Sequence, residues 1–360
     1  MSIFGRNLQI DIYGRSHAEY IGVNIKGLPK GFKIDTDKLM EFMKRRAPKK
    51  SAFSTSRTEG DVPIFTEGVE DGVVVGDTVV ALIYNQNQRS GDYNKLAGVP
   101  RPGHADFAAY KKYGVDYDLS GGGEFSGRLT AALCIAGGIA KQILEERGIY
   151  VGAHIYAVGD IDDTPFESLE LDKNAVESAG KKEFATVSNK AGEKMLALIE
   201  NTKNSLDSIG GVIECAVIGM PAGIGGELFG GLESRICEAV FGVPAVKGVE
   251  FGDGFAVAKA FGSQNNDQYV VQNGEVLPIS NHAGGILGGI STGAPIIVRA
   301  AIKPTPSISK MQKSVNMKTL EPVDLVIGGR HDSCIVPRAV AAIEAAVALA
   351  VLDKIFEEEA

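Results

Sequence analysis

The chain has 360 residues and a formal net charge of −8, with 45 glycines and 23% charged residues. Proteins that bind nucleic acid usually carry a basic excess, so this balance argues against that class. Any anionic ligand must then be met by a local cluster of cations. The glycine content favours tight turns and close backbone approaches over long helical bundles.

The first forty residues predict strand, turn, strand and helix. Residues 7–14 and 21–29 alternate apolar and polar side chains, as half-buried strands do. Asp35 is a candidate N-cap for a helix over 36–46, which Pro48 ends because the residue before a proline avoids the helical region.

The rest of the chain predicts short strands first and then a mixture of helices and strands. Residues 61–84 indicate strands in a meander, and the polar, turn-rich run 85–120 is long for a structureless loop, which is typical of functional loops. We expect helices over 126–147, 190–206, 226–243 and 338–356, strands over 154–162, 210–223, 247–262, 295–304 and 323–329, and an irregular region over 263–294. With no linker and no internal repeat, we expect one interlocked α+β domain over 1–360.

The most apolar stretches predict buried helices. Residues 129–144 contain Lys141, and residues 338–352 contain Arg338 and Glu344, so neither is expected to span a bilayer. The four cysteines are widely spaced and are expected to be reduced thiols. Because the chain opens on a strand-like NLQIDIYG, we expect no secretory leader and a cytoplasmic location.

Residues 101–130 concentrate groups that suit an anionic, phosphorylated ligand. Glycines let backbone N–H groups approach phosphate, arginine forks match its oxygens, and a carboxylate two residues from an imidazole can orient it. A turn beside a solvated histidine is equally compatible with that last spacing. The groups concerned are Arg101, His104, Asp106, Gly121 to Gly123, Ser126 and Arg128.

The remaining histidines give weaker signals. His17 follows a strand, where an isolated histidine is more often a structural hydrogen-bonding group, and His154 lies within a predicted strand and is expected to be structural. His331 and Asp332 stand between a strand and the last helix, a common place for active-site residues. Metal ligation by these two residues with Cys334 is less supported, because no second ligand motif accompanies them.

No known nucleotide motif appears. The chain has no G-x-x-x-x-G-K-[ST], and the G-x-G-x-x-G register fails at Gly223 and at Gly252, which disfavours a Rossmann site. The segment 284–293 is rich in glycine and hydroxyl groups, and 303–307 adds a lysine. Together they are compatible with a phosphate-bearing cofactor, although a tight turn beside a sheet explains the first segment equally well.

Unusual strings occur along the whole chain. They are GRSHAE (14–19), RRAPKKS (45–51), TSRTEGD (55–61), NQNQRSGDY (85–93), RPGHAD (101–106), GGGEFSGRLTA (121–131), DSIGG (207–211), PAVKGVEFGDGF (244–255), GSQNND (262–267), SNHAGGILGGISTG (280–293), IKPTPSI (302–308) and GRHDSC (329–334). In order and spacing they resemble the chorismate synthase family.

The resemblance implies a β-α-β sandwich and a lyase of the shikimate pathway. Members convert 5-enolpyruvylshikimate 3-phosphate to chorismate and inorganic phosphate by a 1,4-anti elimination, with reduced FMN and no net redox change. They are usually homotetramers. Some members reduce the flavin with NADPH themselves, and because this chain lacks a Rossmann signature we expect a separate flavin reductase.

The resemblance also assigns roles to residues. His17 matches the histidine near the leaving phosphate, His104 the one that faces the flavin, and Asp332 the carboxylate proposed to relay a proton from flavin N5. The substrate-binding positions are Arg46, Arg101, Arg128 and Arg330. The FMN-contacting positions are Ser126, Ala245, Gly288, Lys303, Thr305, Ser307 and Arg330.

Some positions depart from the family pattern, namely Arg15, Ala18, Ala52, Val73 to Val75 and Glu124. Arg15 replaces an acidic residue and Glu124 a basic one, so we expect the two to compensate each other as an ion pair. Ala52 replaces a substrate-site arginine whose charge Lys49 and Lys50 can supply. A diverged relative that binds flavin or phosphometabolite without catalysis, or a lyase with an altered substrate, is the alternative. The retained proton-handling positions favour an active enzyme.

Overall fold

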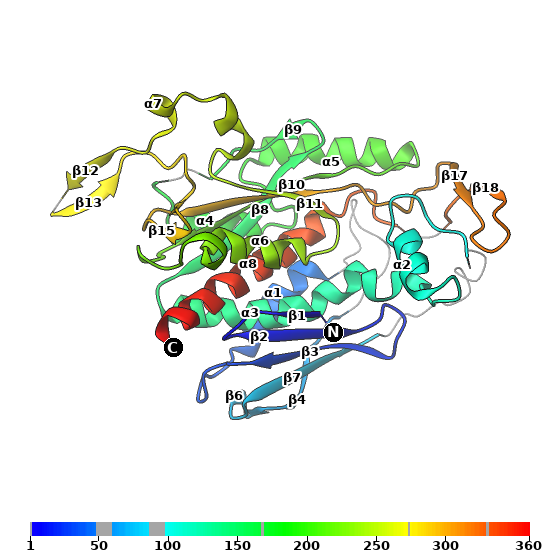
Figure 1. The fold of residues 1–360 in the computed structure, drawn as a ribbon, viewed down its shortest axis with the longest axis horizontal. Coiled ribbons are helices and arrows are strands. Elements are labelled where there is room, and N and C mark those ends of the chain that lie inside the picture. Colours follow the sequence, from blue (N-terminus) through cyan, green and yellow to red (C-terminus); the bar gives the residue numbers. More distant parts are fainter. Residues whose placement is uncertain (1, 48–59, 86–97, 167–168, 273, 329–330) are drawn as a thin grey trace.

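The computed structural model describes residues 2–47, 60–85, 98–166, 169–272, 274–328 and 331–360. Two five-stranded antiparallel sheets enclose a layer of helices, as Figure 1 shows. The α+β sandwich expected from the sequence is therefore confirmed. Arg330, Ala52, Lys49, Lys50 and most of the motif 85–93 lie outside the described residues.

The first sheet contains the strands predicted near the start of the chain. Its order is β1 (Ser2–Phe4), β2 (Gln9–Gly14), β3 (Tyr20–Lys26), β7 (Thr78–Tyr84) and β4 (Ile64–Glu67), and the two-stranded ribbon β5 (Val69–Glu70) and β6 (Val73–Val74) lies between β4 and β7 in sequence. Alternate residues of β7 are buried against the helices, because one face of the sheet is covered, and most of the central strand β3 is buried as well.

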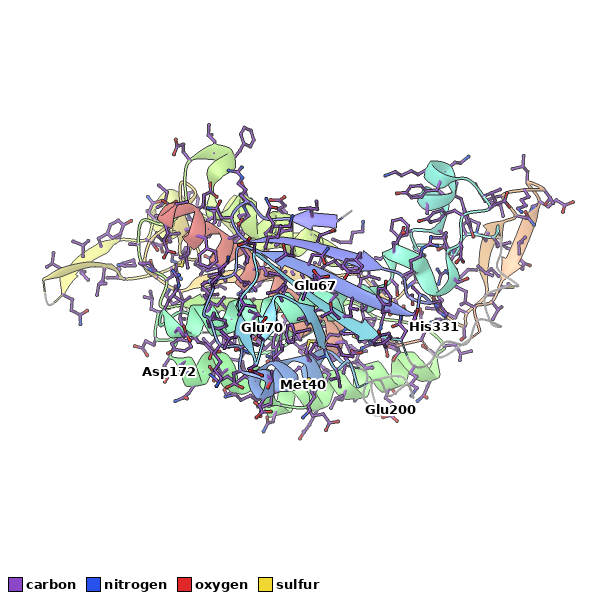
Figure 2. All side chains as sticks on the ribbon, turned by 90° about the horizontal axis from the view of Figure 1, so that it is seen from below. Met40, Glu67, Glu70, Asp172, Glu200 and His331 are labelled. Carbon is purple, nitrogen blue, oxygen red and sulfur yellow. The ribbon has the colours of Figure 1, made fainter. Side chains whose placement is uncertain are left out.

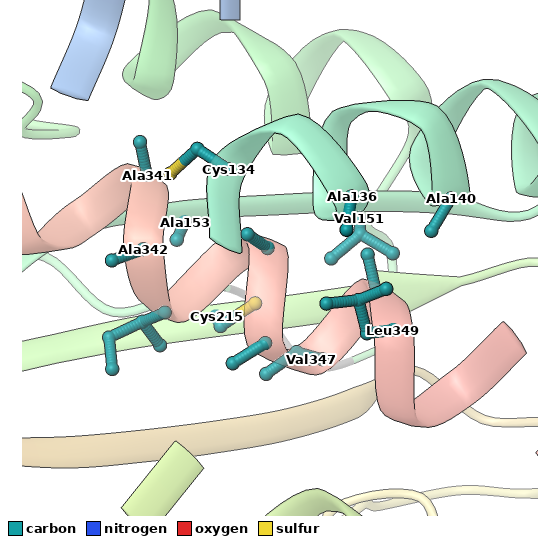
Figure 3. Close-up of a cluster of buried hydrophobic side chains, with 14 of the residues drawn as sticks. Cys134, Ala136, Ala140, Val151, Ala153, Cys215, Ala341, Ala342, Val347 and Leu349 are labelled. Carbon is teal, nitrogen blue, oxygen red and sulfur yellow. The ribbon is translucent and has the colours of Figure 1, made fainter. Parts of the chain in front are cut away.

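The helix layer consists of α1 (Thr36–Arg46), α3 (Thr130–Glu146), α6 (Leu232–Phe241) and α8 (Val336–Glu359). Asp35 accepts a hydrogen bond from the amide of Lys38, so the predicted N-cap is confirmed. The helices α3 and α8 pack closely because Gly137 faces Ala345, where a Cβ on the glycine would overlap the alanine. Figure 3 shows small side chains of α3 and α8 packed together above β8 and β10.

The second sheet covers the other side of α8. Its order is β11 (Val246–Phe251), β16 (Ile296–Ile302), β10 (Gly211–Ile218), β8 (Tyr150–Val158) and β9 (Ile161–Asp162). The helices α4 (Lys173–Lys181) and α5 (Asn189–Asn204) lie on its outer face. The strand β10 is buried along most of its length because helices cover both faces.

Several regions differ from the prediction, and one of them is 163–189, where α4 forms although no element is expected there. The run 85–120 contains a helix, α2 (Asp106–Tyr113), and the second half of 247–262 forms a 3₁₀ turn over Gly254–Lys259 instead of a strand. The region 263–294 is less irregular than expected. It holds the short helix α7 (Gly262–Asn265) and the two hairpins β12–β13 (Tyr269–Gln272, Glu275–Pro278) and β14–β15 (Ile286–Leu287, Ile290–Ser291), and a further hairpin, β17–β18 (Gln312–Val315, Pro322–Leu325), follows it.

Candidate active site

A cavity of about 580 Å³ opens where α3 and α8 begin, a volume common for small-molecule sites. Its wall combines the loops around 16–17, 101–105 and 121–130 with segments 242–245, 303–307 and 331–342. Figure 2 labels His331, one of the wall residues, at the end of the molecule from which α2 and the β17–β18 hairpin project. Two helix N-termini at one cavity favour a negatively charged ligand.

Two arginines of the wall, Arg46 and Arg128, share one carboxylate. Nη1 of Arg46 lies 2.8 Å from one carboxylate oxygen of Asp61, and Nη1 of Arg128 pairs with the other oxygen. Nε of Arg46 donates to Oγ1 of Thr130 at 3.1 Å, and Nε of Arg128 donates to Oδ1 of Asn85 at 2.9 Å. One carboxylate therefore holds two cations, which leaves a net positive charge in the group.

The charge of Arg46 is disfavoured where it stands. Burial lowers its pKa to about 10, the charges of Arg338 and Arg128 act in the same direction, and Asp61 opposes them. Neutral pH lies well below that value, so the guanidinium stays charged. An anion placed among these guanidinium groups would relieve their mutual repulsion, which makes the cluster a site for phosphate or carboxylate.

A second ion pair, between Arg101 and Asp106, orients the imidazole of His104. Nε and Nη2 of Arg101 lie 2.7 and 2.8 Å from the two carboxylate oxygens of Asp106, and Nδ1 of His104 lies 2.5 Å from one of them. Burial alone would raise the pKa of Asp106, but the hydrogen bonds from Arg101 and His104 lower it well below its usual range. The side chain of His104 is only 16% exposed, so the alternative of a solvated histidine beside a turn is wrong.

The triple glycine 121–123 forms a turn with φ values of 62°, 90° and 55°. His17 lies against its first glycine and His104 against its second. The amide of Gly122 donates to the carbonyl of Leu119 at 2.8 Å, so this N–H does not serve the phosphate contact expected of it. The glycines instead bring the backbone close to two imidazole rings.

A carboxylate and a further arginine line the wall at the start of α8. Nη1 of Arg338 lies 2.7 Å from Oδ2 of Asp332. Nε of Arg338 is buried and, within the part of the chain that the structure describes, has no hydrogen-bond partner. Buried donors are rarely left without an acceptor, so this nitrogen indicates a place for a ligand oxygen.

The opposite wall carries the segments 242–245 and 303–307. The amide of Lys303 donates to the carbonyl of Ala245 at 2.9 Å, and its ammonium donates to the carbonyl of Gly103. Burial lowers the pKa of Lys303. Ser307 is buried, and Oγ1 of Thr305 is buried with no partner among the described residues. Hydroxyl groups and a cation of this kind fit a phosphate-bearing ligand.

Comparison with known proteins identifies the family. The chorismate synthase family model matches residues 8–356. The chain is 48% identical over 366 residues to the chorismate synthase of Lancefieldella parvula, covering 99% of this chain and 96% of that one. It is 40% identical to the chorismate synthase of Thermococcus gammatolerans, with 99% and 98% covered. The chain belongs to the chorismate synthase family.

The fold agrees with that membership. A crystal structure titled as chorismate synthase superposes with a TM-score of 0.77 at 25% identity, covering 98% of this chain and 93% of that chain. As a member of the chorismate synthase family, the chain is a lyase of the shikimate pathway that acts by phosphate elimination.

The cavity brings together most residues that the resemblance to chorismate synthases assigned. They are His17, His104, Asp332, Arg46, Arg101, Arg128, Ser126, Ala245, Lys303, Thr305 and Ser307. Their roles stay predictions. Arg330 lies outside the described residues.

Gly288 does not join the others. It lies in the β14–β15 turn, next to Gly289, whose carbonyl accepts from the amide of Leu232. Gly289 lies against Gly231, and the neighbouring Gly230 accepts a hydrogen bond from Lys354 near the C-terminal end of α8, whereas the cavity lies at the N-terminal end. Lys354 lies 12 residues beyond Ala342, the last α8 residue of the wall, which is about 18 Å along the helix. Gly288 is also absent from the lining, so a contact between Gly288 and a ligand in the cavity of the same chain is not supported.

Sequence reasoning missed three polar residues of the site. The sequence pattern indicates Arg338 only as a charge that interrupts an apolar helix. An arginine in the first turn of such a helix can also indicate a functional site. Asp61 and Asn85 hold arginines in place, and both belong to strings, 55–61 and 85–93, that had been noted only for the resemblance.

The predicted compensation between two departures is confirmed. Nε of Arg15 lies 3.4 Å from a carboxylate oxygen of Glu124. Arg15 also contacts Asp118 and stacks over the ring of Tyr117, whose hydroxyl donates to Glu124. The side chains of the pair are 32% and 47% exposed, so the pair contributes about 0–1 kcal/mol. Glu124 is thus partly neutralised at the edge of the cavity.

Other expectations concern groups outside the cavity. His154 is fully buried between Asp163 and Glu214, as expected of a structural histidine. In the described ranges no cluster of three His, Cys, Asp or Glu side chains could hold a metal ion. The cysteines are free thiols, and no described helix combines the length and apolar character that a membrane span requires.

Proposed function

We propose that this chain eliminates phosphate from 5-enolpyruvylshikimate 3-phosphate in a 1,4-anti sense, to give chorismate, with reduced FMN bound in the same cavity. The observation that carries the proposal is one pocket whose lining includes two imidazoles, a carboxylate and four arginines with matching assigned or charged roles (His17, His104, Asp332, Arg46, Arg101, Arg128, Arg338). A substrate with two carboxylates and a phosphate needs such a cluster of cations.

The residues of the 242–245 and 303–307 wall fit a flavin mononucleotide. The buried Oγ1 of Thr305, without a partner among the described residues, and the Lys303 ammonium suit its phosphate, and Ala245 and Ser307 would lie against it. Ser126, at the start of the short turn before α3, would contact the flavin from the other wall. When bound, reduced FMN supplies electron density to the substrate as the phosphate leaves.

The arginine group around Asp61 would hold the substrate. Arg46 keeps its charge in a buried setting and shares the Asp61 carboxylate with Arg128. Ionic hydrogen bonds to carboxylate or phosphate are strong in such a setting. The N-termini of α3 and α8 add positive potential to the same place. Guanidinium groups that are held in fixed positions, and not mobile side chains at the surface, would then orient the substrate.

Three groups would handle protons. His17, as an imidazolium, would donate to the departing phosphate oxygen, and this neutralises the charge that develops there. His104 is held by Asp106 so that Nε2 faces the glycine turn and the cavity. Asp332, whose carboxylate Arg338 fixes, would relay from flavin N5 the proton that the elimination releases. The C–O bond to phosphate and the C6–H bond break, and one new double bond forms.

An anaerobic assay with chemically reduced FMN and enolpyruvylshikimate phosphate tests the proposal. We expect release of chorismate and phosphate in equal amounts, and we expect His17→Ala and Asp332→Ala to lose at least about 100-fold in kcat while FMN binding, followed by flavin fluorescence, is retained. Tight flavin binding without turnover by the unaltered chain would contradict the proposal. Unaltered rates in both variants would contradict the assigned roles.

We also propose a homotetramer in the cytoplasm, served by a separate flavin reductase. Support for self-association comes from large apolar side chains exposed on one part of the chain, among them Phe229 at 90%, Phe255 at 82% and Val271 at 76%. Apolar surface of this kind is typical of protein–protein contacts. The separate reductase rests on the missing dinucleotide motif. Light scattering of the purified chain measures the assembly.

A further inference from the structure

Two of the histidines that line the cavity, His17 and His104, lie against the neighbouring glycines Gly121 and Gly122. Gly121 has φ 62° and ψ 14°, and Gly122 has φ 90° and ψ 0°. The backbone amide of Ser16 donates to the carbonyl of Gly123 at 3.1 Å, so the segment that carries His17 is tied to the same turn. The turn and the histidine-bearing loops are therefore one local unit.

A side chain at Gly121 could not coexist with the present ring position. A Cβ there would overlap Cε1 and Nδ1 of His17 and would lie 2.8 Å from Oγ of Ser16. A Cβ on Gly122 would lie 3.3 Å from Nε2 of His104, which is a tight contact and not an overlap. Both obstacles are the outer atoms of side chains that can rotate. An added methyl group would thus displace the rings before it disrupted the backbone fold.

We propose that Gly121 and Gly122 are positioning residues, whose missing side chains fix where the imidazoles of His17 and His104 stand. This inference rests on the proposed function of the cavity. General acid catalysis requires hydrogen-bond distance to the reacting oxygen, and a displacement of about 1 Å costs up to about 100-fold in rate. The ring of His17 is the more constrained of the two, so Gly121 has the larger effect.

The positive φ of these glycines offers a different explanation, because an L-residue is strained there whatever the space. Gly148 separates the two explanations. It has φ 74°, and a Cβ on it would meet nothing within 4 Å. It lies at the C-terminal end of α3, away from the cavity. Gly148→Ala therefore introduces similar backbone strain without a clash against a ring.

The test compares kcat, KM and thermal midpoints of Gly121→Ala, Gly122→Ala and Gly148→Ala in the anaerobic assay. We expect Gly121→Ala to lower kcat by about 10- to 100-fold with KM within about threefold, and Gly122→Ala to lower it by a smaller factor. Gly148→Ala should keep the rate of the unaltered chain and lose as much thermal stability as Gly121→Ala. Equal rates for Gly121→Ala and Gly148→Ala would overturn the inference.

A double variant shows whether Gly121 acts through His17. In the His17→Ala background the ring is gone, so Gly121→Ala should cause no further loss of kcat, and the two effects should not add. A further loss of the full factor would overturn the inference and leave the proposed function intact. Unaltered turnover by His17→Ala alone would overturn the role of His17 and, with it, the positioning role. If Gly121→Ala does not fold, Gly122→Ala with His104→Ala gives the same cycle.

Discussion

Asp61 shows how a residue that does not line the cavity can determine its chemistry. Its side chain is 0% exposed and pairs with Arg46 and Arg128 at the same time. Its backbone adopts φ 42°, a left-handed value that costs free energy in a residue other than glycine. The contacts of the carboxylate with two guanidinium groups offset that cost. Asp61 orders the anion site and does not itself meet the substrate.

We predict that Asp61→Asn impairs substrate binding most strongly at alkaline pH. Loss of the carboxylate removes the interaction that raises the pKa of Arg46, so this pKa falls further below about 10. Arg46 then loses its proton at a lower pH. Between about pH 8 and 10, just below the present pKa of Arg46, we expect KM for the substrate to rise by about tenfold more in the variant than in the unaltered chain. Steady-state kinetics across this range measure it. Parallel KM profiles would contradict the prediction.

At the scale of elements, sequence prediction succeeded where one face of an element is buried. The helix 36–46 and the strands of the first sheet show the expected periodicity and caps, because the core selects apolar residues on one side. The helix α2 was missed because it is short and its first residue, Asp106, contacts Arg101 instead of capping the helix. The β12–β13 hairpin was missed because its described side chains are exposed and carry no alternation.

The site was predictable only in part from the sequence. Resemblance located the groups that touch a ligand, since these lie in distinctive strings. The contacts that hold them could not be read from spacing: Asp61 and Arg128 are 67 residues apart, and only the fold brings them together. Gly288 shows the converse, because a matching string does not ensure a place in the cavity of one chain.

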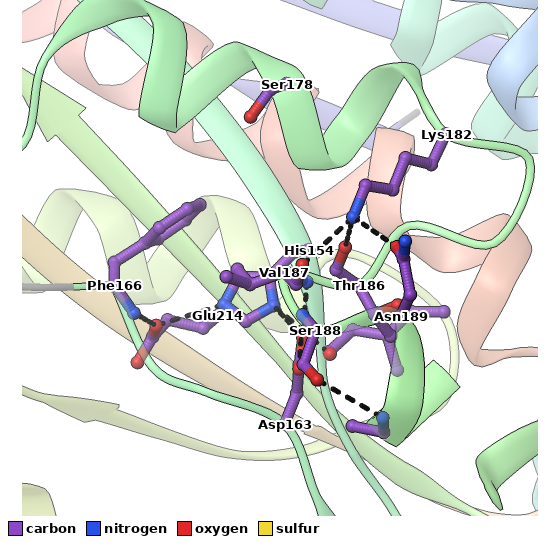
Figure 4. A network of polar contacts seen from close by, with 12 residues as sticks. His154, Asp163, Phe166, Ser178, Lys182, Thr186, Val187, Ser188, Asn189 and Glu214 are labelled. Atoms are coloured by element: carbon purple, nitrogen blue, oxygen red, sulfur yellow. Dashed lines mark hydrogen bonds and ion pairs between the residues drawn. The ribbon is translucent and has the colours of Figure 1, made fainter. Parts of the chain in front are cut away.

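A buried network of ion pairs and hydrogen bonds around His154 stabilises the second sheet (Figure 4). His154 of β8 lies 3.2 Å from Asp163 and 3.1 Å from Glu214 of β10. Arg299 of β16 lies 2.7 Å from the other oxygen of Glu214. Asp163 also accepts hydrogen bonds from the backbone amides of residues 187 and 188. Three strands and the segment before α5 are thus joined through charged side chains.

We predict that His154→Gln lowers stability at pH 6 by about 3–5 kcal/mol, the cost of breaking a buried ion pair. Burial alone would lower the pKa of His154, but the hydrogen bonds to Asp163 and Glu214 raise it. The stabilisation by the protonated imidazole is therefore complete below about pH 6.5, the pKa of histidine in the unfolded chain. It is lost as pH rises through the higher pKa that His154 has in the folded chain. The difference in the free energy of unfolding between the variant and the unaltered chain should therefore decrease towards pH 9.

Urea unfolding at pH 6, 7.5 and 9 measures that difference. His282→Gln is the matched control, because His282 also faces a carboxylate, that of Asp253, but its side chain is 36% exposed. A constant difference for His154→Gln across the three pH values would show that the imidazole does not carry the pH dependence.

For the molecule as a whole, the helix layer both supports the cavity and joins the two sheets. The helix α8 is buried nearly all round, so its side chains meet α3 on one side and β8 and β10 on the other (Figure 3). Glu344 is the charged residue at the centre of this contact. It pairs with Arg45 of α1 and Lys141 of α3, and it accepts from the amide of Ala153 of β8 at 3.2 Å.

We predict that Glu344→Gln destabilises the whole fold by about 3–5 kcal/mol at neutral pH, since a buried carboxylate is lost and two partly buried cations lose their partner. Burial alone would raise the pKa of Glu344, but Arg45 and Lys141 lower it to about 2. The stabilisation by the charged carboxylate is thus present above about pH 4.3, the pKa of glutamate in the unfolded chain. It is lost as pH falls towards the pKa of about 2 that Glu344 has in the folded chain. Guanidinium unfolding between pH 3 and 7 should show a smaller acid dependence in the variant. Glu146→Gln, at an exposed glutamate of α3, should behave as the unaltered chain does. A loss below about 1 kcal/mol at neutral pH, typical of a surface pair, would mean that apolar packing alone joins the two sheets.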